Sequence, residues 1–217
     1  MGEACLKRVR ATLVTEGSSD RALLHIIRWC ILQLEPSISI EAQHADLRNL
    51  RNPPKALRDK IRVGLGQYPC DALFIHIDSD NKTRGERVDT IRGAIEELRN
   101  KKMLVPGYVC VIPVRALESW LLFDEESIRY ASGNPSGRQT LALPKLSTIE
   151  DIATPKEMLH ALIKQASGKT GRRLKQLNIS QVVQLIAERS NDFSPLRGLR
   201  AFHDFELELG DLIRRQI

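Results

Sequence analysis

The chain has 217 residues, of which 42% are hydrophobic and 28% are charged, a composition typical of a globular protein with a sizeable core. Its formal net charge of +6 is compatible with nucleic-acid binding but does not require it. No apolar run approaches the roughly 18 residues that span a bilayer, and the first residues lack the apolar stretch of a signal peptide. We therefore expect a cytoplasmic protein with no membrane partner.

The cysteines are also consistent with a cytoplasmic protein. The four cysteines, Cys5, Cys30, Cys70 and Cys110, lie far apart, and no pair has the spacing of zinc ligands. Most of them lie in or beside apolar segments, so we expect reduced, packed thiols.

The first half of the chain alternates strand-like and helix-like segments. Apolar patterns predict four strands, at 10–16, 37–45, 71–78 and 107–114. Helical periodicity predicts three helices between them, at 19–35, 53–65 and 84–102. The third strand, DALFIHID, is apolar almost throughout, as a central strand of a parallel sheet is. This alternation predicts an α/β, Rossmann-like domain over residues 1–125, with a parallel four-stranded sheet flanked by helices.

The second half of the chain, residues 126–217, reads as a helical C-terminal region packed on the sheet domain. One helix is predicted to run from 118 to 131, followed by a loop at 132–144. In the helix predicted at 154–166, Thr154 is the expected N-cap, Pro155 takes the first helical position, and Glu157 completes a capping box. Further helical segments are predicted at 172–190 and 194–217.

Acidic residues follow three of the four predicted strands. Glu16 ends the first strand and Asp20 opens the helix after it. Asp78 ends the third strand and Asp80 follows it, and Glu118 follows the fourth. The carboxyl ends of parallel strands meet at one edge of a sheet. Clustered carboxylates repel each other unless a cation or a proton neutralises them, and oxygen ligands suit Mg²⁺ or Mn²⁺.

Each of these acids also has a structural interpretation when taken alone. Asp20, Asp78 and Asp80 could cap a turn or a helix, and Glu118 could offset a helix dipole. Glu16, at a strand end before a glycine, is the hardest to explain structurally. Taken together, the acids favour a metal site.

The segment TEGSSDRALL, followed by Asp-x-Asp after the third strand, resembles the Toprim (topoisomerase–primase) domain. The version it resembles occurs in OLD-family nucleases and in small stand-alone Toprim-like proteins, some of them associated with ATPases in phage defence. The resemblance covers roughly residues 8–125. The later segments PVRALESWLLFD and SPLRGLRAFHDF are similar to parts of the stand-alone families.

The resemblance implies a Mg²⁺-dependent nuclease that hydrolyses phosphodiester bonds in DNA or RNA, working as an effector with an ATPase partner in anti-phage defence. Glu16 would be a metal-linked acid or general acid–base. Asp78 and Asp80 would hold Mg²⁺, with Asp20 as an accessory ligand and Glu118 as a ligand of a second metal. Nucleases of the OLD type also use a basic residue near the metals, for which the candidates are Lys82, Arg84, Arg115 and Lys169. Lys169 is taken here as the catalytic one.

Basic residues form two clusters along the chain. One spans Arg48 to Arg62, and the other surrounds SGKTGRRLK. Either could receive a phosphate backbone or be a solvated helix face. The residues predicted to contact nucleic acid are Arg84, Arg115, Lys164, Arg172, Arg173 and Lys175. The GKT triplet does not make a phosphate-binding loop, because Ile163 stands where that motif requires glycine.

Other interpretations remain open. The chain could be a non-catalytic Toprim-like subunit that docks on an ATPase or on nucleic acid. A phosphatase or glycosyltransferase using Asp-x-Asp is weaker, because Asp-x-Asp follows the third strand and Glu16 would have no role. His76, flanked by isoleucines, is expected to be a packed core histidine, as Trp120 and its neighbours are expected to be core. An apolar face of the C-terminal helices leaves assembly with a second copy of the chain open.

Overall fold

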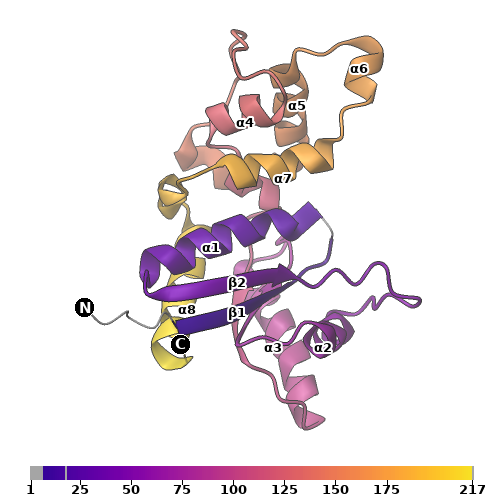
Figure 1. Cartoon of the computed structure of the whole chain (residues 1–217), viewed down its shortest axis with the longest axis vertical. Coiled ribbons are helices and arrows are strands. Elements are labelled where there is room, and N and C mark those ends of the chain that lie inside the picture. Colours follow the sequence, from indigo (N-terminus) through magenta and orange to yellow (C-terminus); the bar gives the residue numbers. More distant parts are fainter. Residues whose placement is uncertain (1–6, 18, 217) are drawn as a thin grey trace.

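A computed structural model describes residues 7–17 and 19–216. Four parallel strands form one sheet in the order β2–β1–β3–β4 (Figure 1). The strands are β1 (Lys7–Val14), β2 (Ile38–His44), β3 (Ala72–His76) and β4 (Gly107–Val111). The predicted α/β fold with a flanked parallel sheet is thus confirmed. The strands that precede Glu16 and Asp78 each stop two residues before the acid, so these side chains project from loops beyond the sheet.

Helices cover both faces of the sheet. One face packs against α1 and the C-terminal helices, and the other against α2 and α3, which together enclose a second hydrophobic cluster (Figure 1). The buried strand β3 contributes to both clusters, Phe74 to one and Leu73 to the other, as the alternation of side chains along a strand requires. These helices are α1 (Leu23–Leu34), α2 (Leu57–Gln67) and α3 (Arg84–Asn100).

The C-terminal half is helical, as predicted. Four short helices lie above α1 in Figure 1, and the last helix returns to pack against β4. Trp120 packs between Phe202 and Phe205 of this last helix, with ring centroids 5.1 and 5.7 Å away. The helices are α4 (Glu125–Ala131), α5 (Pro155–Ser167), α6 (Gly171–Lys175), α7 (Ile179–Arg189) and α8 (Arg200–Gln216).

Four shorter 3-10 helices complete the fold, and two of them correct the predicted helix boundaries. The helix predicted over 118–131 is wrong: it is a 3-10 helix, η2, followed by α4, because Asp124 caps α4 by accepting a hydrogen bond from the Ser127 N–H at 2.9 Å. The first helix likewise starts as the 3-10 turn η1. The four are η1 (Ser19–Ala22), η2 (Leu117–Leu121), η3 (Leu146–Asp151) and η4 (Ser194–Gly198).

The helix starts show which capping predictions succeed. Helix α5 begins at Pro155 as predicted, but the capping box at Thr154 is wrong: the Thr154 side chain makes no cap hydrogen bond, and its ψ of 66° departs from the extended backbone of a capping residue. The capping box forms instead at the start of α3, where Thr83 is extended at ψ 156° and exchanges hydrogen bonds with Glu86. The segment predicted as one helical stretch over 172–190 divides into α6 and α7, because Asn178 caps the second.

The thiols behave as the sequence predicts where they are described. Cys30 and Cys110 are buried, Cys70 is half-buried, and all three are free; Cys5 lies outside the described residues. Burial, followed by the Glu208 charge, raises the pKa of Cys110 to about 12. No helix in the described part of the chain has the length and apolar character needed to cross a membrane.

Glu208 of α8 fastens the C-terminal helix to the edge of the sheet. One of its carboxylate oxygens accepts the backbone N–H of Cys110 in β4 at 2.9 Å, and the other pairs with the guanidinium of Arg84 at the start of α3. Asp204, one turn earlier, lies 3.5 Å from Arg84 Nε. In the edge strand β4, the backbone N–H of Cys110 therefore has its acceptor in a side chain from the far end of the chain. The same contact gives Arg84 a structural partner; its role in nucleic-acid binding stays a prediction.

Replacing Glu208 by alanine is expected to lower the free energy of unfolding by about 2 kcal/mol, because the change leaves a strand N–H and a guanidinium without their acceptor. Asp211→Ala on the same helix removes exposed pairs with Arg214 and Arg215 and should cost less than about 0.5 kcal/mol. Urea unfolding of the two variants measures the difference. Equal costs would show that Glu208 does not fasten α8 to the sheet.

Candidate functional site

The strand order places a switch point at the carboxyl ends of β1 and β3. From β1 the chain moves to β2 on one side, and it then crosses to β3 on the other side of β1. In open parallel sheets, such a point is where the loops diverge and leave room for a ligand. Asp20 follows β1, Asp78 follows β3, and Glu118 lies in η2 beyond β4. Three of the five predicted acids therefore gather around this point.

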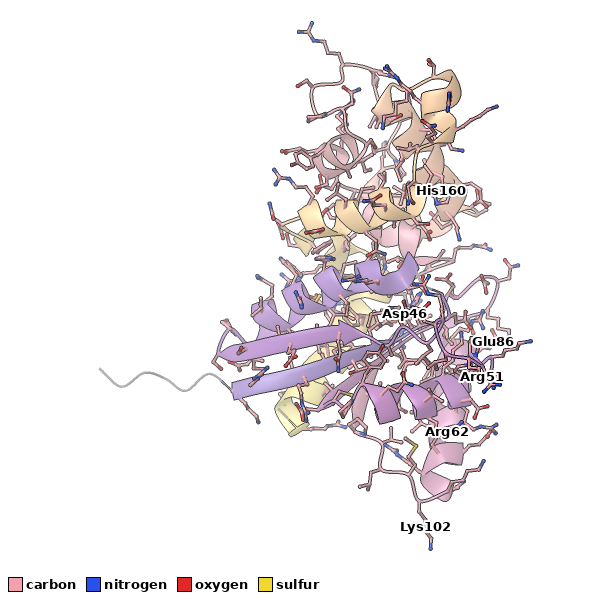
Figure 2. The ribbon with its side chains drawn as sticks, turned by 45° about the vertical axis from the view of Figure 1, so that its right-hand side comes forward. Asp46, Arg51, Arg62, Glu86, Lys102 and His160 are labelled. Carbon is pink, nitrogen blue, oxygen red and sulfur yellow. The ribbon has the colours of Figure 1, made fainter. Side chains whose placement is uncertain are left out.

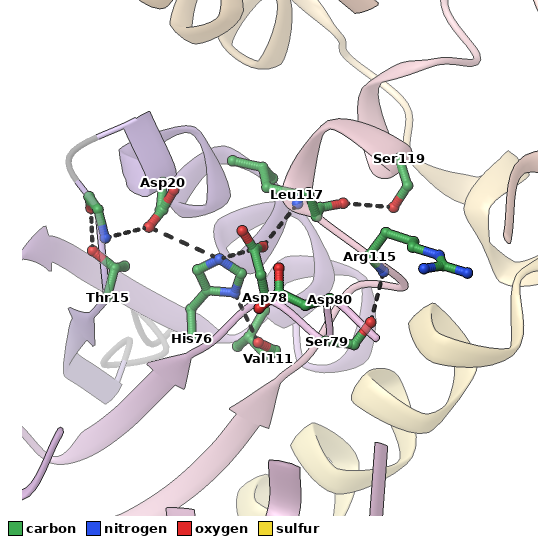
Figure 3. Close-up of polar contacts among 12 residues, drawn as sticks. Thr15, Asp20, His76, Asp78, Ser79, Asp80, Val111, Arg115, Leu117 and Ser119 are labelled. Carbon is green, nitrogen blue, oxygen red and sulfur yellow. Dashed lines mark hydrogen bonds and ion pairs between the residues drawn. The ribbon is translucent and has the colours of Figure 1, made fainter. Parts of the chain in front are cut away.

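His76 lies between two of these acids. Its Nε2 is 3.3 Å from Asp78 Oδ1 and 3.9 Å from Asp20 Oδ2, and its Nδ1 is 2.9 Å from the Val111 carbonyl of β4 (Figure 3). Both ring nitrogens face acceptors, so the geometry favours a proton on each. Burial alone lowers the pKa of His76, but the Asp78 hydrogen bond and the charges of Asp20 and Asp78 outweigh it, and the pKa is raised.

The same two carboxylates also hold backbone. Asp78 accepts the Leu117 N–H at 3.2 Å, which draws η2 onto the end of β3. Asp20 accepts the Gly17 N–H at 2.8 Å and so closes the turn after β1. A β-carbon at Gly17 would lie 3.2 Å from Asp20 Oδ2, closer than most such contacts. Glycine therefore allows the Asp20 carboxylate to sit against the turn, where it accepts the Gly17 N–H, and α1 itself starts without a side-chain cap.

Glu118 is the most enclosed of the acids, with 4% of its surface exposed. Burial is the main reason why the pKa of Glu118 is raised; its own backbone N–H and the Lys156 charge oppose the rise, while Asp78 and Asp20 add to it. The three carboxyl groups therefore act on one another electrostatically. Lys156, near the start of α5, was not among the basic candidates, and no local sequence pattern marks it, because it reaches the acids only through the packing of α5 on η2.

Asp80 and Arg115 occupy left-handed backbone conformations, with φ of 50° and 65°. They are joined to each other, since the Asp80 N–H donates to the Arg115 carbonyl at 3.1 Å, and the Arg115 N–H donates to Ser79 Oγ at 2.6 Å (Figure 3). The Arg115 guanidinium donates to the Asn81 side chain. The Asp80 carboxylate forms an ion pair with Arg87 of α3 at 2.7 Å and is largely exposed. Asp80 therefore sits at the predicted edge, but its charge is directed to α3.

Glu16 lies at the same edge, beside a cavity. It is exposed, and its backbone carbonyl accepts a hydrogen bond from Lys60 Nζ at 3.0 Å. Thr15 fixes the same turn by donating its hydroxyl to the Gly17 carbonyl. The sequence thus placed Glu16 correctly at a strand-to-helix turn. Ser18, within the quoted TEGSSD segment, lies outside the described residues.

The remaining basic residues lie in the helical region. Lys169 follows α5 and lines a pocket with Ser132, Gly133 and residues of α7. Lys156 is at the other end of α5, and 13 helical residues span about 20 Å. The structure therefore does not bring Lys169 to the acids. The exposed residues Lys164, Arg172, Arg173 and Lys175 lie on α5 and on α6, which is far from the strand ends in Figure 1.

Comparison with protein-family models, with curated proteins and with solved structures finds no match at the level of significance applied.

The fit of these residues to a divalent cation rests on their donor chemistry. The buried edge offers carboxylate oxygens, the ligands that Mg²⁺ prefers, and Mg²⁺ often uses only one or two carboxylates together with water. The described residues contain no group of three or more His, Cys, Asp or Glu side chains arranged to enclose an ion. Asp78 and Asp20 are the acids with a neighbour in common, the His76 Nε2, and a cation held by them would share their oxygens with this ring.

His76 is the member of the site that the sequence analysis did not assign. The expectation of a packed histidine is correct as to burial, because 1% of its surface is exposed. The available signal was its spacing from Asp78: residues two apart along an extended chain project to the same side. A histidine two positions before a carboxylate, at the end of a buried strand, predicts contact between them.

We expect His76→Gln to lower the free energy of unfolding by about 2 kcal/mol, because the change leaves two carboxylates facing each other without a cation between them. The sign of the pH dependence follows from the raised pKa. The folded protein holds the proton more tightly than the unfolded chain, so the wild-type advantage is complete below the ordinary pKa of 6.5 and is lost as pH rises through the folded pKa.

Chemical unfolding of wild type and His76→Gln at pH 6 and at pH 9 measures this difference. The gap between the two proteins should be wider at pH 6. A gap that stays constant or widens at pH 9 would contradict a protonated His76.

Proposed function

We propose that this protein is a Mg²⁺-dependent nuclease that hydrolyses phosphodiester bonds in DNA or RNA, in the manner of the Toprim domains that its sequence resembles. The observation that carries the proposal is the convergence of Asp20, Asp78 and Glu118, from three separate segments, at the switch point of a parallel sheet. His76 faces two of these carboxyl groups, and titratable groups that act on one another at such a point favour a functional role.

The roles of the chain's own residues follow from their positions. Asp78 and Asp20 would hold Mg²⁺, and Glu118, whose pKa is raised chiefly by burial, can hold a proton at its carboxyl group. Glu16, exposed beside the turn, is placed to exchange a proton with solvent or substrate. Lys156 and Arg115 supply positive charge at the carboxyl edge of the sheet, where the sugar–phosphate backbone of the nucleic acid would lie. Bound Mg²⁺ would contribute an activated water and charge compensation at the phosphate.

The resemblance also supports a cellular setting. We propose that the protein acts in the cytoplasm as an effector with an ATPase partner in anti-phage defence. Assembly with a second copy of the chain is compatible with this setting. Exposed apolar side chains such as Leu104 and Leu207, 94% and 55% exposed, are available for protein contacts.

A non-catalytic binding subunit is the second candidate, and one observation favours it. Each of the two best-placed carboxylates already has partners: Asp78 contacts His76 and the Leu117 N–H, and Asp20 contacts the Gly17 N–H. In such a subunit these contacts would shape a docking loop on the ATPase or on nucleic acid. This interpretation predicts that the acids can be replaced without loss of function in a complex.

The nuclease proposal predicts metal-dependent cleavage of plasmid DNA or of total RNA. Asp78→Asn and Glu16→Gln should each reduce the rate by about 100-fold or more, because both change the electrostatics of the reacting centre. Asp89→Asn is the matched control, since Asp89 is exposed on α3 and its ion pair among the described residues is with Arg92. Cleavage that survives both site variants would be due to a contaminant, and absence of cleavage by any of the proteins would favour the binding subunit.

Metal binding can be measured without cleavage. Mg²⁺ at about 100 times its dissociation constant should stabilise the wild type by about 2.7 kcal/mol, a rise of roughly 5–10 °C in Tm for a chain of this size. The rise should vanish on EDTA addition and in Asp78→Asn, but persist in Asp89→Asn. An unchanged Tm in wild type at millimolar Mg²⁺ would contradict a metal site formed by the protein alone.

A further inference from the structure

A cavity of about 200 Å³ opens beside Glu16, at the carboxyl ends of β1 and β2. The Asp20 carboxylate, which accepts the Gly17 N–H, is not among the residues that line it. The cavity adjoins the candidate site but shares only the turn with it. None of the roles proposed above uses it.

One part of the cavity wall is apolar. Ala45 and Leu47 are buried, and the adjacent prolines Pro53 and Pro54 present rigid rings in the loop that leads to α2. Prolines and small aliphatic side chains form flat surfaces with little freedom to move, which suits contact with the face of a planar ring. A cavity of this size would hold roughly six or seven waters at ~30 Å³ each, comparable to one heterocycle and too small for a peptide segment.

The opposite part of the wall is polar and has a defined hydrogen-bonding character. Thr15 donates its hydroxyl proton to the Gly17 carbonyl, so the same oxygen must accept from His44 Nε2, 2.9 Å away. A neutral His44 with its proton on Nε2 has an unprotonated Nδ1, which can only accept. Burial is the main reason why the pKa of His44 is lowered, and it supports the neutral ring.

The charged residues that line the cavity are Lys60, Arg48, Glu16 and Asp46, and further cations follow in the loop that leads to α2. Lys60 Nζ donates to the Glu16 carbonyl and has two further protons to donate. Beyond it, Arg51 and Lys55 are exposed and form no ion pair within the described residues, whereas Arg48 is paired with Asp46 at 2.7 Å. Figure 2 shows Arg51 and Asp46 on the side of the molecule where β1 and β2 end. Unpaired cations beside an apolar slot are complementary to a ring that carries a phosphate.

We propose that this cavity binds one unpaired nucleotide of a nucleic-acid strand, with its base in the slot and its phosphate near Lys60. The inference rests on the proposed nuclease function and deepens it, because an unpaired base seated beside Glu16 directs the next phosphodiester toward the acids. The substrate would then be single-stranded, or opened locally, since a paired base cannot enter a slot.

A titration of ¹⁵N-labelled protein with nucleoside monophosphates, with the matching nucleosides and with inorganic phosphate tests the cavity without metal and without cleavage. Nucleoside monophosphates should shift the amide signals of residues 44–48 and of Lys60. Nucleosides should shift the same signals with weaker affinity, and phosphate alone should leave signals 44–48 unchanged. Shifts produced equally by phosphate alone would overturn the base slot and leave only an anion contact.

Two variants distinguish the parts of the slot. Ala45→Leu fills the cavity and should weaken both nucleosides and nucleotides by about tenfold or more. Lys60→Gln should weaken nucleotides by about tenfold, the loss of one charge-assisted hydrogen bond, and leave nucleosides unchanged. Ala161→Leu, an exposed position on α5, is the control for Ala45→Leu. If Ala45→Leu fails to fold, Lys60→Gln still tests the proposal, because a Lys60→Gln variant that binds nucleotides as tightly as the wild type would contradict it.

Failure of this inference is distinguishable from failure of the nuclease proposal. Nucleotide binding in the cavity with no cleavage under any condition would support the nucleotide site and contradict the nuclease proposal. Metal-dependent cleavage, with no change in the amide signals of residues 44–48 on nucleotide addition, would contradict the nucleotide site and support the nuclease proposal. Asp89→Asn should bind nucleoside monophosphates like the wild type, because Asp89 is exposed on α3 and does not line the cavity.

Discussion

The placement of two carboxylates around one buried imidazole organises the edge of this sheet. His76 is enclosed by the strands, and its two ring nitrogens are faced by Asp78 and Asp20 on one side and by the Val111 carbonyl on the other. The same carboxylates then fix backbone that would otherwise be free: Asp78 holds η2, and Asp20 holds the turn after β1. One electrostatic arrangement therefore connects β1, β3, β4 and η2 at the point where the loops diverge.

The C-terminal region depends on a comparable long-range contact. Glu208 satisfies the N–H of the edge strand at Cys110 and neutralises Arg84, and the aromatic rings of α8 enclose Trp120. A sheet edge with unpaired N–H groups is prone to pair with other chains, and α8 covers it here. The helices over α1 and the sheet share one hydrophobic cluster. Packing of the helical region also brings Lys156 within range of Glu118, so the C-terminal half contributes a charge to the site.

Two groups of side chains meet at the Glu16–Gly17 turn. Asp20 accepts the Gly17 N–H and faces His76. Thr15, His44 and Lys60 line the cavity. Under the proposed function, Glu16 at this turn would act on a substrate held by the acids and by the cavity. Glycine at position 17 leaves room for the Asp20 carboxylate, which would lie 3.2 Å from a β-carbon there.

The sequence by itself determined the four parallel strands, the helices between them and the position of Glu16, Asp78 and Asp80 at the strand ends. Hydrophobic periodicity and residue order are local properties, and they suffice to place side chains at one edge of a parallel sheet. They did not suffice at the break between η2 and α4, where a cap formed by Asp124 overrides a continuous apolar pattern. The metal, the nucleic-acid substrate and the ATPase partner remain proposals.

Only the tertiary structure decided which charges face one another. Arg84 and Arg87 follow the same loop, yet one pairs with α8 and the other with Asp80. Lys156 and Lys169 lie at opposite ends of α5. Of these two, Lys156 is the one whose charge acts on Glu118. His76 and Glu118 have their roles because strands and helices distant in the chain pack around them. Ion pairs and raised pKa values depend on distance and burial, and these are set by long-range packing that residue spacing along the chain does not encode.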